Sequence, residues 1–90
     1  MTTIHKYILE AGTTELQLPR NYEILTVRVQ DSAFGSGVML YAQVNPTEPK
    51  VFVKFLIVPT GGEIPEGATK YLATIEVTMG LIFHVFQIFD

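Results

Sequence analysis

Apolar and polar residues alternate along much of the 90-residue chain, in short runs rich in Val, Ile, Thr, Tyr and Phe. Such runs are typical of β-strands, in which successive side chains point to opposite faces of a sheet. Glycine and proline fall between the runs, where they mark turns. The pattern predicts seven strands, over residues 3–10, 15–18, 23–30, 38–44, 51–58, 71–77 and 81–89.

The alternation also predicts which side chains face the interior of the protein. In the second predicted strand, Leu16 and Leu18 share one face, and in the third strand Leu25, Val27 and Val29 do. Polar residues stand between them in both strands. A period of two residues is typical of strands that are buried on one side only.

Turn and helix signals are few. Met79-Gly80 predicts a tight hairpin turn in which Gly80 supplies a positive φ. Residues 65–72 are the one helix candidate, because Pro65 suits a first helical position, but Gly67 and the short length limit it to a single turn. We therefore expect one all-β or nearly all-β domain over residues 1–90, a small antiparallel β-sandwich or an open barrel.

The strands over 51–58 and 81–89 do not alternate, since they are apolar on both faces. A chain this short has few layers with which to cover both faces of a strand. Apolar strands left bare would promote aggregation, so these two strands predict a homo-oligomer in which copies of the chain cover them.

Composition supports that prediction and excludes some partners. Hydrophobic residues make up 48% of the chain and charged residues 17%, with a mean hydropathy of +0.31. The net charge of -3 argues against a nucleic-acid polymer as partner, which requires clustered Lys and Arg. There is no cysteine and no apolar run long enough to span a membrane, so we expect a cytoplasmic protein without membrane contact.

Catalytic and metal-binding patterns are weak. His5 and His84 are the only histidines, and no nucleophile motif accompanies them. Nothing in the sequence positions further ligands beside these two imidazoles. We expect no enzyme activity, no metal and no cofactor, with each imidazole hydrogen-bonded within a sheet or at an interface.

The most distinctive local run is Thr60-Gly61-Gly62. Paired glycines can turn backbone N–H groups into a concave nest that binds an anion. The alternative is a loop that needs glycine only for its tight backbone geometry.

Three strands are each interrupted by one basic or titratable side chain, namely Arg28, Lys54 and His84. If these strands are neighbours, the three side chains form a cationic cluster on one sheet face or across an oligomer cleft, where an arginine suits a phosphate or carboxylate. The alternative is three separate solvated or ion-paired side chains. With the Thr60-Gly61-Gly62 run, they are the candidate site for a small anionic or nucleotide ligand.

Four aromatic residues form a further candidate surface for stacking, although such residues more often pack in a core or an interface with the hydroxyl at the wet edge. They are Tyr7, Phe34, Tyr41 and Tyr71.

An ordered set of short motifs spans nearly the whole chain. They are His5-Lys6-Tyr7, Ile24-Leu25-x-Val27-x-Val29-Gln30, Leu40-Tyr41-Ala42-x-Val44, Thr60-Gly61 before Ile64-Pro65, Tyr71-Leu72-x-Thr74 and Phe83-His84-Val85-Phe86. Together they resemble a family of short, uncharacterised bacteriophage and prophage proteins. Its members often have tryptophan at the positions of His5 and Tyr41, and some have histidine at that of Gly62.

The resemblance implies a phage accessory protein that works in a bacterial cytoplasm. The leading hypothesis is a non-enzymatic protein that binds and neutralises a host factor, for instance as an oligomeric sponge for a nucleotide-type immune signal. The alternatives are a protein-binding inhibitor of a host enzyme and a structural or assembly component of the virion.

Overall fold

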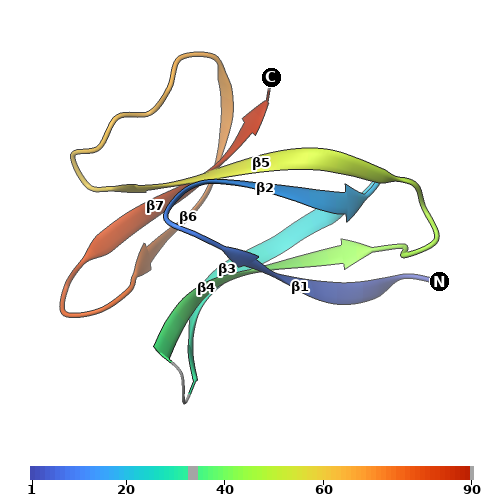
Figure 1. The fold of residues 1–90 in the computed structure, drawn as a ribbon, viewed down its shortest axis with the longest axis horizontal. Helices are drawn as coiled ribbons and strands as arrows, with labels where there is room; N and C mark the ends of the chain where they lie inside the picture. Colours follow the sequence, from blue (N-terminus) through green and yellow to red (C-terminus); the bar gives the residue numbers. More distant parts are fainter. Residues whose placement is uncertain (33–34, 90) are drawn as a thin grey trace.

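The computed structural model describes residues 1–32 and 35–89, and this part of the chain consists of strands, turns and loops without a helix. Seven strands follow one another, separated by short connections except for one long loop between the fifth and the sixth (Figure 1). They are β1 (Thr3–Leu9), β2 (Gly12–Pro19), β3 (Glu23–Ser32), β4 (Gly35–Val44), β5 (Lys50–Pro59), β6 (Ala68–Glu76) and β7 (Ile82–Phe89).

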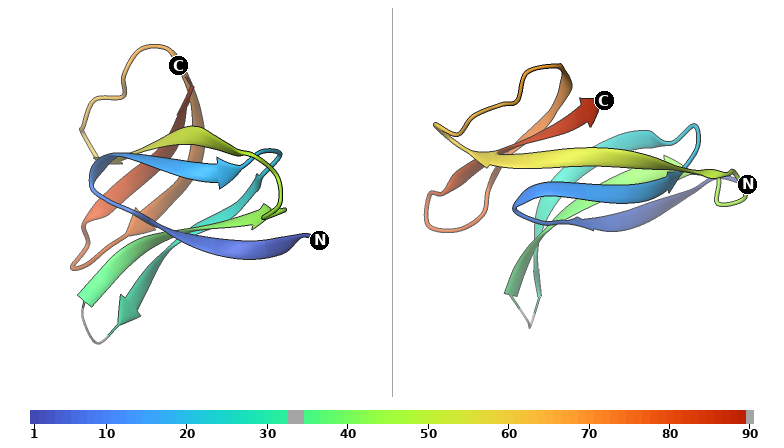
Figure 2. Two further views of the ribbon diagram at one scale, coloured as in Figure 1. Left: turned by 45° about the vertical axis from the view of Figure 1, so that its right-hand side comes forward. Right: turned by 45° about the horizontal axis from the view of Figure 1, so that its top comes forward.

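The strands form two antiparallel sheets that pack face to face (Figure 2). One sheet has three strands in the order β1-β4-β3, and the other has four in the order β2-β5-β7-β6. The chain crosses from the first sheet to the second between β1 and β2, and β3 contacts β6 at the opposite side. The predicted all-β fold is confirmed.

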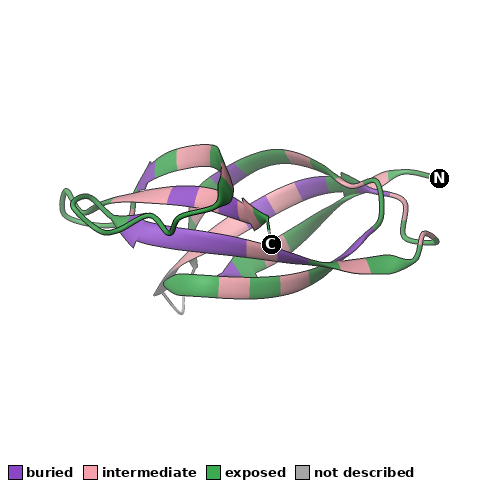
Figure 3. Cartoon of the chain, turned by 90° about the horizontal axis from the view of Figure 1, so that it is seen from above, coloured by how far each residue is buried: buried purple, intermediate pink, exposed green. Residues whose placement is uncertain are grey.

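The core lies between the two sheets, where every strand contributes the side chains of one face. Colouring by burial shows buried and exposed residues alternating along most strands (Figure 3). The largest fully buried side chains are those of Leu18, Leu40, Val44, Phe55 and Val85.

Among residues 1–32 and 35–89, one polar side chain is buried in this core. Gln87 of β7 is only 5% exposed, and its Nε2 donates a hydrogen bond to the Tyr22 hydroxyl at 2.7 Å. Tyr22 lies between β2 and β3 and packs against the core cluster. The bond therefore ties the end of β7 to the connection between the two sheets, and it satisfies a donor that would otherwise be buried at a cost.

Residues 65–72 contain no helical turn, in agreement with the prediction of one at most, because β6 begins at Ala68 and pairs with β7. One prediction about local structure is wrong. Leu25, expected inside with Val27 and Val29, is 45% exposed. A β-bulge between Ile24 and Thr26 shifts the register there, so that Ile24 takes the inward position instead.

The turn that joins β6 to β7 has the predicted form. The Leu81 N–H donates to the Thr78 carbonyl at 2.8 Å, and the two residues between them have φ values of 48° (Met79) and 78° (Gly80). Two positive φ values in the centre of a turn are typical of type I′ hairpins, which favour Asn-Gly. Met79, a residue with a Cβ and 96% exposed, is therefore strained.

Replacing the strained residue is expected to stabilise the protein. Met79→Asn places a residue that tolerates positive φ at this exposed site, so the free energy of unfolding should rise by about 0.5–1 kcal/mol. Gly80→Ala should lower it by about 1 kcal/mol, because alanine tolerates positive φ poorly. Urea unfolding of both variants measures the changes, and equal signs would contradict the assigned turn.

The Gln87–Tyr22 bond is tested by removing its hydroxyl. Tyr22→Phe leaves the Gln87 Nε2 group buried without an acceptor, so the free energy of unfolding should fall by about 1–3 kcal/mol. Tyr71→Phe, which removes a hydroxyl at an exposed position, is the matched control and should change it by less than about 0.5 kcal/mol. Equal effects of the two substitutions in urea unfolding would show that the bond carries no special weight.

Candidate functional site

The outer face of the four-stranded sheet is unusually apolar. β5 and β7 are its two central strands, so their outward side chains lie side by side. Phe52 is 70% exposed and Tyr71 57%. We call this surface the apolar face, and its members are Phe52, Leu56, Val58, Tyr71, Ile82, Phe86 and Ile88.

Leu56 and Val58 show that this face is a second apolar layer. Both are buried, although neither belongs to the core cluster between the sheets. In the strand register Leu56 is paired with Phe86, and Phe86 with Tyr71, whose ring packs edge-on against it with centroids 5.8 Å apart. The apolar face is thus packed within itself but remains open to a partner.

His84 lies on this same face and is held at both ring nitrogens. Its Nε2 is 2.9 Å from the Thr60 hydroxyl, and its Nδ1 is 3.0 Å from the Thr74 hydroxyl. The Tyr71 hydroxyl in turn lies 2.7 Å from the Thr74 hydroxyl. The imidazole of His84, which β7 carries, is therefore held from two other elements, namely the turn that follows β5 and the strand β6.

The direction of the hydrogen bonds in this network is not fixed by the groups that form it. A hydroxyl can donate or accept a hydrogen bond, so either ring nitrogen of His84 can carry the proton. The hydroxyls of Thr60 and Thr74 are neutral, so either of them can change its hydrogen-bond partner without leaving an unpaired charge. A ligand or partner that reaches this face meets three hydroxyls and an imidazole beside apolar side chains, as is usual in binding sites that combine apolar contact with a few polar groups.

The Thr60-Gly61-Gly62 run forms a tight turn. The Gly62 N–H donates to the Pro59 carbonyl at 2.9 Å, and Gly61 has a φ of 90°. A Cβ on Gly62 would lie 3.0 Å from that carbonyl oxygen, so a larger residue would fit only if Pro59 moved by a few tenths of an ångström. The Thr60 N–H donates to the Ile82 carbonyl at 3.2 Å. Because two of the three amides are engaged, the run serves backbone geometry and anchors Thr60 beside His84, and it leaves only one N–H for an anion.

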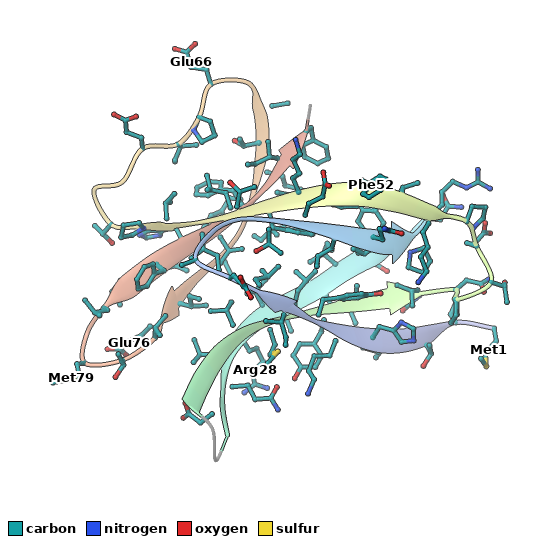
Figure 4. All side chains as sticks on the ribbon, viewed as in Figure 1. Met1, Arg28, Phe52, Glu66, Glu76 and Met79 are labelled. Atoms are coloured by element: carbon teal, nitrogen blue, oxygen red, sulfur yellow. The ribbon has the colours of Figure 1, made fainter. Side chains whose placement is uncertain are left out.

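The three cationic candidates do not form a cluster on one sheet face. Arg28 belongs to β3, in the other sheet, and Figure 4 shows it far from Phe52 of the apolar face. Lys54 and His84 do share the outer face of the four-stranded sheet, but Lys54 pairs with Ile88, four residues along β7 from His84. That offset corresponds to about 13 Å. A cluster on one sheet face is therefore not formed, because β3 and β5 fall in different sheets, whereas a cluster across an oligomer cleft stays a prediction.

The tyrosines likewise do not form one stacking surface. Tyr7 packs against the core, where burial raises its pKa, whereas Tyr41 lies on the outer face of the three-stranded sheet and Tyr71 on the apolar face. Phe34 lies outside the described residues. Three tyrosines on three different surfaces cannot stack against a common ligand.

The two histidines are also separated, because His5 belongs to β1 in the other sheet, where its Nδ1 lies 3.5 Å from the Tyr7 hydroxyl. Within residues 1–32 and 35–89, no three His, Asp or Glu side chains are grouped as metal ligands. The same part of the chain holds no helix able to cross a membrane.

Sequence reasoning missed the partners of His84 on β6. The hairpin centred on Met79-Gly80 pairs residues that lie at nearly equal distances from it, and it pairs Thr74 with His84. The turn prediction therefore contained the signal for this pair. Tyr71 could not be found in the same way, because a bulge between Tyr71 and Ala73 shifts the pairing.

Each ring nitrogen of His84 has its own partner, which predicts separable effects of two substitutions. Thr60→Val should shift the Nε2 resonance, and Thr74→Val the Nδ1 resonance, because each removes a single hydroxyl while keeping the shape of the side chain. Long-range ¹H–¹⁵N correlation spectra at fixed pH measure both nitrogens. If either substitution moves both resonances equally, or neither, the assigned partners are wrong.

Comparison with known proteins gives one match. The family model described as "Domain of unknown function (DUF7352)" matches residues 1–89, which is nearly the whole chain. No curated protein and no solved structure shows a significant match.

Proposed function

We propose that this chain, which belongs to the DUF7352 family, is a non-enzymatic binding protein that assembles with copies of itself through the apolar face. In this proposal it acts as a bacteriophage accessory protein in the bacterial cytoplasm, where it binds and neutralises a host factor. The observation that carries the proposal is the position of the two doubly apolar strands side by side in the centre of one sheet.

The composition of the apolar face favours a protein partner. Interfaces between copies of a protein have an apolar centre with few charges and a polar rim. Here the outward residues of β7 include no charged side chain, and Glu15 and Glu76 lie on the two edge strands of the same sheet. Lys54 of β5 also lies on this face and is paired with Glu15 in the strand register. The exposed Phe52 ring is of the kind that contributes most to binding energy when a partner covers it.

The shape of the molecule supports the same conclusion. The chain measures 40 × 37 × 17 Å and has a radius of gyration of 13.4 Å, against about 12 Å for a typical domain of this length. It exposes 5955 Å² of surface, and a monomer of this mass typically exposes about 5,200 Å². The surplus is comparable to the area of about 800 Å² that one partner buries in a standard interface.

A second copy is the occupant that we propose for this face. In a symmetric dimer the same patch meets itself, so a single self-complementary surface is sufficient. The network of Thr60, Thr74 and His84 would then lie beside the seam between subunits. A host ligand with hydrogen-bonding groups, including the nucleotide-type signal of the sponge hypothesis, fits a cleft at that position.

The proposal predicts that one charge on the apolar face disrupts the assembly. Phe52→Glu should convert the oligomer to a monomer, because a buried carboxylate without a partner is strongly unfavourable. Ile4→Glu is the matched control, since Ile4 is 58% exposed on the other sheet and the same charge there should leave the mass unchanged. Light scattering after size exclusion measures both masses.

Two results would contradict self-association through this face. The wild-type chain would have the mass of one subunit at both low and high concentration, or Ile4→Glu would dissociate the oligomer as fully as Phe52→Glu. A monomer that captures one host protein in stoichiometric amount would favour the inhibitor of a host enzyme, since an exposed apolar face also serves that role.

A further inference from the structure

A second surface, on the outer face of the three-stranded sheet, combines two cationic side chains with one tyrosine. Tyr41 of β4 is at its centre, with Lys6 of β1 opposite on one side and Thr26 of β3 opposite on the other. Arg28 is paired with Met39, the next outward residue of β4. Two cationic side chains therefore flank one tyrosine, from the two strands on either side of it.

A hydrogen bond sets the position of the tyrosine. The Tyr41 hydroxyl donates to Gln30 Oε1 at 2.9 Å, and Gln30 is paired with Gly37, two outward positions along β4 from Tyr41. The ring and the glutamine side chain together span the level of Arg28, which lies between them on β3. Arg28, Gln30 and Tyr41 line a hollow of about 170 Å³ with Val29.

The groups around this hollow are mainly hydrogen-bond donors. Because Oε1 of Gln30 accepts the tyrosine hydroxyl, its amide NH₂ is left to donate to something else. The Arg28 guanidinium offers five N–H groups in a planar fork, and the Lys6 ammonium offers three. The face thus presents donors with a flat aromatic ring among them.

The two cations have no carboxylate partner in the described part of the chain. There the one ion pair joins Arg20 and Glu48, remote from this face. Glu23 is on the same face but is paired with Gln43, two outward positions from the level of Arg28, or about 13 Å. Lys6 and Arg28 therefore place two positive charges on this face, although the whole chain carries -3 and Asp31 follows Gln30 on β3.

We propose that this surface binds a small anion that carries a flat ring, of the nucleotide or aryl phosphate class. The Arg28 fork and the Gln30 amide hold the phosphate oxygens, Lys6 adds charge from the other side, and the ring of the ligand stacks on Tyr41. This site goes beyond self-association and does not depend on it, because it lies on the sheet opposite the apolar face.

Titration of the ¹⁵N-labelled protein with adenosine monophosphate tests the proposal. Amide shifts should concentrate on β1, β3 and β4, and affinity should fall as salt is added. Adenosine lacks the phosphate and inorganic phosphate lacks the ring. Each should bind at least about tenfold more weakly than adenosine monophosphate, because each loses one set of contacts.

Substitution locates the binding energy. Arg28→Ala should weaken binding of adenosine monophosphate by about tenfold or more, and Arg28→Lys should restore only part of it because an ammonium lacks the planar fork. Lys50→Ala removes the same charge from an exposed position of β5 and is the matched control, expected to change the affinity less than about twofold. Arg28 is exposed, so its replacement should leave the fold intact, which the same spectra report.

Four outcomes would overturn the site: no shifts at millimolar nucleotide, shifts confined to the four-stranded sheet, equal binding of phosphate and nucleotide, or equal losses in Arg28→Ala and Lys50→Ala. The Phe52→Glu variant separates this proposal from self-association. It should bind adenosine monophosphate as the wild type does even where it is monomeric, and loss of that binding would count against an independent site.

Discussion

The pairing of β5 with β7 is the constraint on which the rest of the structure depends. Both strands are apolar on both faces, and only central positions in a sheet can cover such strands from two sides. Inward, the pairing aligns Phe55, Ile57 and Val85 into the middle of the core. Outward, it aligns the apolar face, which lies beside Lys54 and His84 and which the three-stranded sheet does not cover. One set of cross-strand bonds therefore creates both the core and the exposed surface.

The remaining elements close the molecule around that pair. β2 and β6 flank it with strands whose outward residues are largely polar, which confines the apolar surface to the centre of the sheet. The three-stranded sheet covers the inner side, and the bond between Gln87 and Tyr22 ties the end of β7 to the chain that leads into it. A polar bond in this place gives the packing of the two sheets a defined geometry that apolar contacts alone specify less sharply.

The sequence predicts the strands well because each depends on local alternation, turn residues and β-branched side chains. All seven are found, and so is the hairpin at Met79-Gly80. Leu25 was misplaced because a bulge is a property of the paired strands and leaves no mark on the period of one strand alone. Residues 65–72 form no helical turn because pairing with β7 overrides the weak helical preference of a short segment.

The candidate site was predictable only in part, since its residues come together through strand order. Thr60 and His84 are both candidate residues from the sequence. The Thr60 hydroxyl lies 2.9 Å from His84 Nε2, because the turn after β5 returns to the neighbouring strand. Arg28 could not be assigned correctly, since nothing in a single strand reveals which sheet it joins. Its actual neighbours, Lys6 and Tyr41, become visible only with the order β1-β4-β3.

The thinness of the molecule has a consequence for how an assembly would present itself. Its two layers of strands lie within a shortest dimension of 17 Å, with the apolar face on one side and the surface around Arg28 and Tyr41 on the other. If two copies associate through the apolar face, their Arg28 surfaces point in opposite directions. Each dimer then carries two equivalent sites, which are too far apart to contact the same small molecule. Such a dimer would bind two small ligands independently, one at each site. It would bridge two separate targets when both carry the recognised group.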